Sequence, residues 1–167
     1  DSVDQVTITR QCNTPPVISN DEFTLVEDSV LTANLLDEND LDPDSTALVV
    51  DTNLVVEPNH GTFVVNEDGS FTYTPDANYY GSDTIVVSVC DSGVPLPALC
   101  GNDTIIIVIS PVNDSPTVEN EYVSGAPGAT ISGNVLDNDS DIENTSLTLN
   151  TEPLVGPNNG TFTINPD

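Results

Sequence analysis

Two β-branched segments flank a tight turn in residues 59–74, which read NHGTFVVNEDGSFTYT. Residues 61–66 and 70–74 are rich in Val, Thr, Phe and Tyr, the side chains that favour strands. Between them, Asp68-Gly69 supplies the positive φ angles that a type I′ turn needs. The stretch therefore predicts a β-hairpin.

The rest of the chain repeats this alternation of short β-branched segments and turn residues, and no segment shows the apolar spacing of an amphipathic helix. The other expected strands are residues 22–26, 29–35, 46–56, 84–90 and 103–110. The continuous apolar run at residues 105–109 predicts a central strand buried on both faces. The sequence thus predicts an all-β sandwich.

The charge of the chain is extreme, because 28 Asp and Glu face one Lys or Arg, for a net charge of −27. This balance excludes nucleic acid and anionic membrane surfaces as partners, since both attract basic side chains. No apolar run reaches the ~18 residues of a membrane span, so we expect no membrane insertion. Repelling carboxylates disfavour a compact fold, so bound divalent cations, high salt or an extended arrangement must compensate.

The sequence contains an internal repeat. Residues 59–68 (NHGTFVVNED) recur as residues 158–167 (NNGTFTINPD), and residues 34–37 (NLLD) recur as residues 134–137 (NVLD). A repeat of this length indicates tandem domains. We predict the last strand of a preceding repeat at 1–13, a complete repeat at 14–114, and the first half of a further repeat at 115–167. That half is either truncated or completed by strands from another chain, because half a sandwich cannot bury its own sheet face.

Two of the three cysteines flank a predicted hairpin. Cys90 ends one expected strand and Cys100 opens the next, so a disulfide can close the loop between them. A disulfide across a loop this short gains roughly 2–3 kcal/mol of stability and indicates an extracellular, periplasmic or lumenal setting. Two buried free thiols are the alternative. We expect the partner of Cys12 in the missing part of the preceding repeat.

Acidic side chains gather in two loops, residues 37–44 (DENDLDPD) and 137–143 (DNDSDIE). Alternating carboxylates in a loop can converge on one hard cation, and Ca²⁺ takes six to eight oxygen ligands at ~2.3–2.6 Å. A solvated acidic loop without a metal is the alternative interpretation.

The order of motifs resembles the bacterial cadherin-like or Ig-like tandem repeats of giant surface adhesins. The motifs stand at residues 34–42, 60–62, 68–83 and 111–116. The last of these, PVNDSP, also looks like a cadherin linker, and versions with a cysteine hairpin are similar to gliding-associated surface proteins of the Bacteroidota. The resemblance implies tandem Greek-key β-sandwiches from an extracellular, cell-surface protein.

In that family calcium lies between consecutive domains, which implies two sets of ligands here. The junction after residue 114 would use Glu27, Asp76, Asn113 through its carbonyl, Asp114, Asp139 and Asp141. The junction before residue 14 would use Asp40 and Asp42, with Asn13 in the linker. The chain departs from true cadherins at three places: Pro111 replaces the first linker aspartate, Asn78 replaces a glutamate, and Ser124-Gly125 stands where Glu27 falls.

No residue pattern indicates catalysis. The single histidine, His60, precedes Gly61 in a turn, and no Ser-His-Asp arrangement has a credible base. The paired carboxylates lie in repeated loops without an aromatic platform for sugars, which argues against a glycosidase. Asp-Ser/Thr-aliphatic triplets resemble an O-glycosylation signal of the Bacteroidota, and their acceptors would be Ser29, Ser45, Thr84 and Thr104.

These observations predict a non-enzymatic structural or adhesive repeat segment, rigidified by Ca²⁺ at its interdomain junctions. Its partners would be neighbouring repeats of the same chain, other copies in a filament, or cell-surface ligands. Two alternatives remain at this point: a module that itself binds a glycan or another copy of the chain, and a spacer attached to a secreted enzyme.

Overall fold

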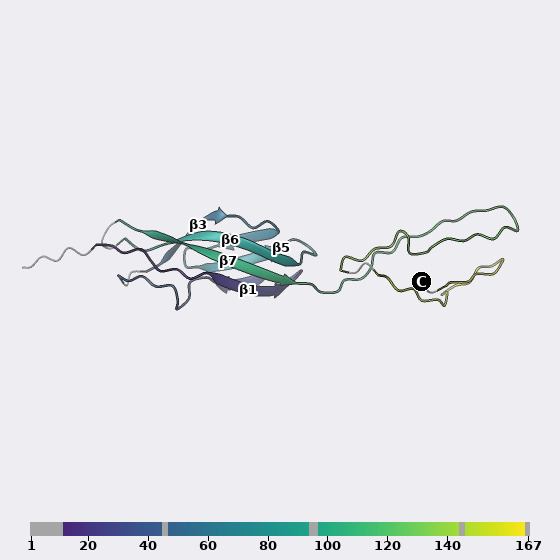
Figure 1. Cartoon of the computed structure of the whole chain (residues 1–167), viewed down its shortest axis with the longest axis horizontal. Coiled ribbons are helices and arrows are strands. Elements are labelled where there is room, and N and C mark those ends of the chain that lie inside the picture. The colour runs from purple at the N-terminus through teal and green to yellow at the C-terminus, as the bar shows by residue number, and fades with distance from the viewer. Residues whose placement is uncertain (1–11, 45–46, 94–96, 144–145, 166–167) are drawn as a thin grey trace, which may run out of the picture. The chain divides into compact units, whose positions relative to one another are not determined.

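The computed structural model describes residues 12–44, 47–93, 97–143 and 146–165. The chain divides into two compact units, Asp1–Pro111 and Val112–Asp167. Every strand of the described residues lies in the first unit (Figure 1). The strand predicted within residues 1–13 lies almost entirely outside the described residues. The predicted glycosylation acceptor Ser45 also lies outside them.

Seven strands form two packed sheets in the first unit, which confirms the predicted all-β sandwich. They are β1 (Asp21–Val26), β2 (Leu31–Asn34), β3 (Val49–Val56), β4 (Gly61–Val65), β5 (Ser70–Pro75), β6 (Gly81–Cys90) and β7 (Cys100–Ser110). One sheet has the order β1-β7-β6-β3, whose strands are labelled in Figure 1. The other sheet has the order β2-β5-β4. All pairs are antiparallel except β1 with β7, which is parallel.

The apolar run at residues 105–109 forms a central strand, β7, but the prediction that it is buried on both faces is wrong. Ile105, Ile107 and Ile109 are buried, whereas Ile106 is 38% exposed. A two-layer sandwich gives each sheet one inner face and one solvent face, so alternate residues of even a uniformly apolar strand face water. The outward side chains of β7 have no third layer to cover them.

The hairpin at residues 66–70 joins β4 to β5 with a turn type that differs from the prediction. Only Gly69 has a positive φ, at 82°, and its N–H donates to the carbonyl of Asn66 at 3.0 Å. The Asn66 N–H in turn donates to the carbonyl of Ser70 at 2.9 Å. A three-residue loop ending in a left-handed glycine is a type I turn with a bulge, rather than the two-residue type I′ turn.

The core lies between the two sheets. Its buried apolar side chains are Leu35, Val50, Phe63, Val65, Phe71, Tyr73, Ile85, Val87, Val89, Ile105, Ile107 and Ile109. At the loop end of the β6–β7 hairpin, Cys90 and Cys100 are paired in the ladder and joined by a disulfide with an S–S distance of 2.05 Å. The predicted cross-link is therefore present, and Cys12 is exposed and free.

The second unit has little regular structure in its described residues, 112–143 and 146–165. They contain a single isolated antiparallel bridge, between Thr117 and Ser140. Several large apolar side chains of this unit are exposed, including Tyr122 at 92% and Leu154 at 99%. Among the residues that the structure describes, none belongs to a helix that could cross a membrane.

Candidate functional site: the acidic loops

Residues 37–44, the first acidic loop, are bound to the segment that leads into β1. Asp40 is 8% exposed, and its Oδ1 atom accepts a hydrogen bond from the Ser19 N–H at 2.9 Å. Beside it, Val17 and Leu41 form an antiparallel bridge. Further along the loop, Asp44 Oδ2 accepts from the Thr14 N–H at 2.6 Å. The loop carboxylates thus hold the start of the repeat in place.

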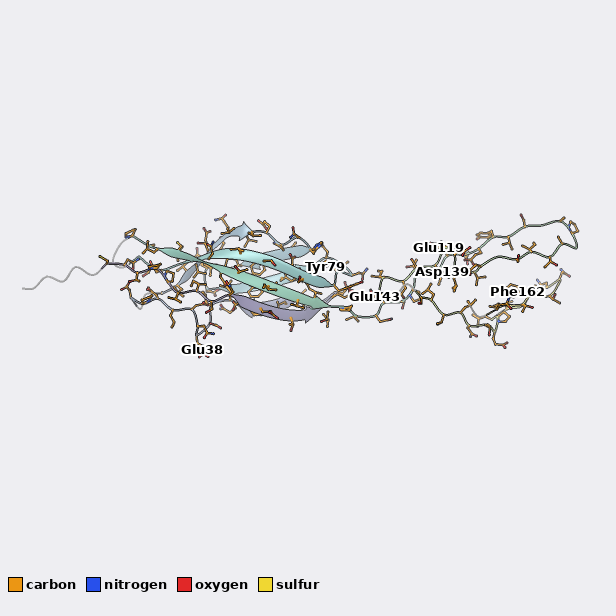
Figure 2. All side chains as sticks on the ribbon, viewed as in Figure 1. Glu38, Tyr79, Glu119, Asp139, Glu143 and Phe162 are labelled. Atoms are coloured by element: carbon orange, nitrogen blue, oxygen red, sulfur yellow. A yellow bond between two sulfur atoms is a disulfide. The ribbon has the colours of Figure 1, made fainter. Side chains whose placement is uncertain are left out.

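Residues 137–143, the second acidic loop, reproduce this arrangement in the second unit. Asp139 Oδ1 accepts from the Glu119 N–H at 2.8 Å, as Asp40 does from Ser19. The Thr117–Ser140 bridge corresponds to the Val17–Leu41 bridge. Figure 2 shows Glu119 and Asp139 close together in this unit. The contacts of the acidic loop therefore recur from one repeat to the next.

The recurrence includes one acid in each loop that the sequence interpretation did not assign. Glu143 Oε2 accepts from the Asp114 N–H at 2.8 Å, which corresponds to the contact from Thr14 to Asp44. Asp44 and Glu143 each stand two positions after the Asp-x-Asp pair of their loop. The continued alternation of acids is the sequence signal by which they could have been identified. In each repeat, a second acid of the loop thus binds the backbone where the repeat begins.

Two carboxylate oxygens of the second loop are buried without a hydrogen bond. They are Oδ1 of Asp141 and Oε1 of Glu143. A buried carboxylate oxygen without a partner is unfavourable, because it has lost the water that solvated it. These two atoms are therefore the strongest candidates for metal ligands in this unit.

The predicted ligands Glu27 and Asp76 lie at the opposite end of the first sandwich from the first acidic loop. The Glu27 N–H donates to the carbonyl of Ser110 at 2.9 Å, where β7 ends, and Glu27 is 3% exposed. The neighbouring loops are tied together, since Asp28 Oδ1 accepts from the Asn78 N–H at 3.0 Å. Asp28 and Asn78 each have a φ of 56°, a left-handed conformation that Asp and Asn tolerate best among residues other than glycine. The structure thus brings the Glu27 and Asp76 loops to one end of the repeat.

The eight predicted calcium ligands are divided between the two units. Glu27, Asp40, Asp42 and Asp76 belong to the first unit, and Asn113, Asp114, Asp139 and Asp141 belong to the second. Within the described parts of the chain, no three Asp, Glu, His or Cys side chains are grouped so that they could hold a metal ion. Calcium binding by these residues therefore stays a prediction.

One buried carboxylate of the first unit, that of Asp83, has a structural role. Asp83 is 2% exposed and accepts from the N–H groups of Asn59 and His60, both at 2.9 Å, and from the Tyr73 hydroxyl at 3.0 Å. Burial works to raise the pKa of Asp83, but these hydrogen bonds together with one from the Thr84 N–H hold it below its usual value. His60 takes part through its backbone, as expected of a turn residue.

The predicted glycosylation acceptors that the structure describes differ in exposure. Thr84 is exposed, whereas Ser29 and Thr104 are partly buried. The Ser29 hydroxyl also donates to the carbonyl of Val26 at 2.5 Å. Thr84 is therefore the most accessible of the three.

A family model described as a bacterial Ig domain matches the sequence over residues 13–95 and again over 113–167. The two matches agree with the resemblance inferred from the motifs, and together they cover most of the chain. No curated protein matches the sequence.

Three solved structures are similar to this chain at low identity. A nucleoside hydrolase-related protein from Saccharophagus degradans, associated with carbohydrate metabolism, is 15% identical with a TM-score of 0.45, covering 59% of this chain and 26% of that one. An endo-fucoidan hydrolase of glycoside hydrolase family 107 is 17% identical with a TM-score of 0.37, covering 60% and 17%. Protocadherin gamma C5, repeats EC1–3, is 15% identical with a TM-score of 0.41, covering 75% and 44%. The chain spans less than half the length of each.

Proposed function

The chain belongs to the bacterial Ig domain family, and from this premise we propose that it is a non-enzymatic structural repeat segment of a large extracellular protein, stiffened by Ca²⁺ at the joints between repeats. In this function the repeats act as spacers that carry load or project an adhesive site. Neighbouring repeats of the same chain are then the principal partners.

The observation that supports this function is the recurrence of the acidic loop. In the first unit Asp40 accepts a hydrogen bond from the Ser19 N–H at 2.9 Å, and in the second Asp139 accepts one from the Glu119 N–H at 2.8 Å. Each donor stands two positions after the residue that forms the β-bridge. In both units, a second acid binds the N–H at the start of the repeat, from Thr14 or Asp114. Because the same acidic contacts recur at the start of both repeats, we infer that they serve the connection between neighbouring repeats.

Calcium suits these loops on chemical grounds. Carboxylate and carbonyl oxygens are the ligands that Ca²⁺ prefers, and it accepts irregular geometry. In the second loop, Oδ1 of Asp141 and Oε1 of Glu143 would gain a partner that the protein does not provide. We add Glu143 to the proposed ligands for this reason. Bound cations would also offset part of the repulsion that a net charge of −27 creates.

The disulfide supports an extracellular location, because such bonds persist in oxidising compartments. It closes the β6–β7 hairpin at the end of the repeat that holds the first acidic loop, since Asn13 Nδ2 donates to Asp91 Oδ2, next to Cys90, at 2.9 Å. The cross-link thus stiffens the region that meets the preceding linker.

Small-angle scattering and thermal melting of the chain, with Ca²⁺ and with EDTA, test the proposal. We expect calcium to raise the melting temperature and to narrow the range of interdomain angles. In the variants Asp141→Asn and Glu143→Gln, calcium should no longer narrow the range of interdomain angles. In the control Asp51→Asn, which changes an exposed side chain of β3, calcium should still narrow it. Identical scattering in calcium and EDTA would reject calcium stiffening. Saturable binding on a glycan array would instead favour a ligand-binding module.

A further inference from the structure

The interior of the first sandwich contains an aspartate that no hydrogen bond satisfies. Asp103 lies on β7 in the same inward-facing row as Ile105 and Ile107, and its exposed fraction is 0%. Both of its carboxylate oxygens, Oδ1 and Oδ2, are buried and have no hydrogen-bond partner. An isolated ionised carboxylate in such a place is strongly unfavourable, so the site needs a neutralising partner.

A second inward-facing aspartate lies beside it. Asp21 begins β1 and shares the inner face of that strand with Phe23 and Leu25. In the parallel ladder Asp21 pairs with Ile105, which places it diagonally across from Asp103 on the same face. Its Oδ2 atom is also buried without a hydrogen-bond partner. Three buried carboxylate oxygens without a hydrogen bond therefore lie on the inner face of two neighbouring strands.

The first acidic loop adds negative charge at the same end. Asp40 binds the N–H of Ser19, two residues before Asp21, and its other oxygen accepts from the Asp37 N–H at 3.1 Å. Burial and the charges of Asp21, Asp40 and Asp37 raise the pKa of Asp103 to about 7. Burial and the charges of Asp40 and Asp37 raise the pKa of Asp21 to about 6.

Among the residues that the structure describes, no Lys or Arg side chain can supply the missing positive charge. The described residues include no Lys and no Arg, and the only histidine, His60, lies in the turn before β4, where its ring stacks on Tyr79 at 4.0 Å. Within the described part of the chain, a bound cation or a proton is what can neutralise the pair of aspartates.

We propose that Asp21 and Asp103 bind a divalent cation of the Ca²⁺ type inside the first repeat, between β1, β7 and the first acidic loop. The pair supplies the hard, anionic oxygens that Ca²⁺ prefers, and backbone carbonyls and water complete its coordination. Asp40 contributes charge, because both of its oxygens already accept backbone N–H groups. This site is separate from the proposed joints, since neither Asp21 nor Asp103 belongs to a linker or an acidic loop.

Calcium binding to the whole chain by equilibrium dialysis at pH 8 tests the proposal. Asp103→Asn should lose one bound calcium ion per chain relative to the wild-type protein, and Asp21→Asn should lose the same ion. Asp139→Asn, which alters only a proposed joint, should retain it, so failure of the joint proposal and failure of this one are distinguishable. Asp51→Asn on the surface should bind as the wild-type protein does.

Thermal melting of the same variants provides a second readout. Without calcium, Asp103→Asn should melt at a higher temperature than the wild-type protein at pH 8, because it removes a buried charge. Added calcium should then raise its melting temperature less than that of the wild type. Unchanged calcium stoichiometry in both Asp103→Asn and Asp21→Asn would overturn the proposal. A second result would also overturn it: if the melting temperature of the wild-type protein rises by the same amount from pH 8 to pH 6 with and without calcium, a proton and not a cation neutralises the two aspartates.

Discussion

Replacement of Asp83 by alanine tests how the first sandwich is held together at the turn before β4. The carboxylate accepts hydrogen bonds from the backbone N–H groups of Asn59, His60 and Thr84 and from the Tyr73 hydroxyl, all between 2.9 and 3.0 Å. Because Asp83 is 2% exposed, water cannot replace these bonds. Asp83→Ala leaves several buried donors without an acceptor.

The expected loss of stability is large. Each buried donor left without an acceptor costs about 1–3 kcal/mol, and costs within one network do not simply add. Two such donors at about 2 kcal/mol each give roughly 4 kcal/mol for Asp83→Ala. For a sandwich of this size each kcal/mol corresponds to about 4–8 °C, so the melting temperature should fall by roughly 15–30 °C.

Urea titration followed by far-ultraviolet circular dichroism measures the free energy of unfolding. Asp51→Ala is the matched control, because Asp51 is exposed on β3 and its carboxylate accepts hydrogen bonds from Asn53 alone among the described residues. Its free energy of unfolding should stay close to that of the wild-type protein. If both variants lose the same small amount, the Asp83 network does not support the fold as argued. The pKa of Asp83 is lowered, so its contribution should be present above pH ~4 and disappear as pH falls through its folded value.

Three further changes test other parts of the account. Reduction of the Cys90–Cys100 disulfide, which spans 10 positions, should lower stability by about 3 kcal/mol in urea titrations, and an unchanged midpoint would show that the bond is not formed in solution. Gly69→Ala should destabilise the protein by about 2 kcal/mol, because φ is +82° and an added Cβ would lie 2.5 Å from Oδ1 of Asn34. A loss of less than about 0.5 kcal/mol, measured by calorimetry, would contradict the turn geometry. In EDTA, Asp21 and Asp103, whose pKa values are raised to about 6 and about 7, favour the folded state when protonated, so their contribution to stability is lost as pH rises through about 6 to 7. Calorimetry should therefore show a higher melting temperature at pH 5 than at pH 8, and equal temperatures would count against the buried pair.

The sequence was sufficient to predict the strands of the first sandwich, because each is a short β-branched segment bounded by turn residues. Tertiary context decided the details. The run at residues 105–109 carries no polar residue to mark a solvent face, so its exposure at Ile106 followed only from the absence of a third layer over the sheet. Gly69 was identified as a turn residue, but the number of loop residues with positive φ depends on the ladder register.

The acidic sites were predictable in part. The spacing of carboxylates indicated Asp40 and Asp139, and both bind the backbone at equivalent positions. Asp103 gave no such signal, because it begins the predicted strand 103–110 and was interpreted only as part of a glycosylation triplet. Only the pairing of β7 with its neighbours shows that this aspartate faces the interior.

The central claim, that calcium stiffens the connection between repeats, is tested most directly by amide ¹⁵N relaxation of the chain in Ca²⁺ and in EDTA. The account predicts that amides of residues 12–111 and 112–165 share one rotational correlation time in calcium and acquire different, shorter ones in EDTA. Separate tumbling of the two units in both conditions would contradict it.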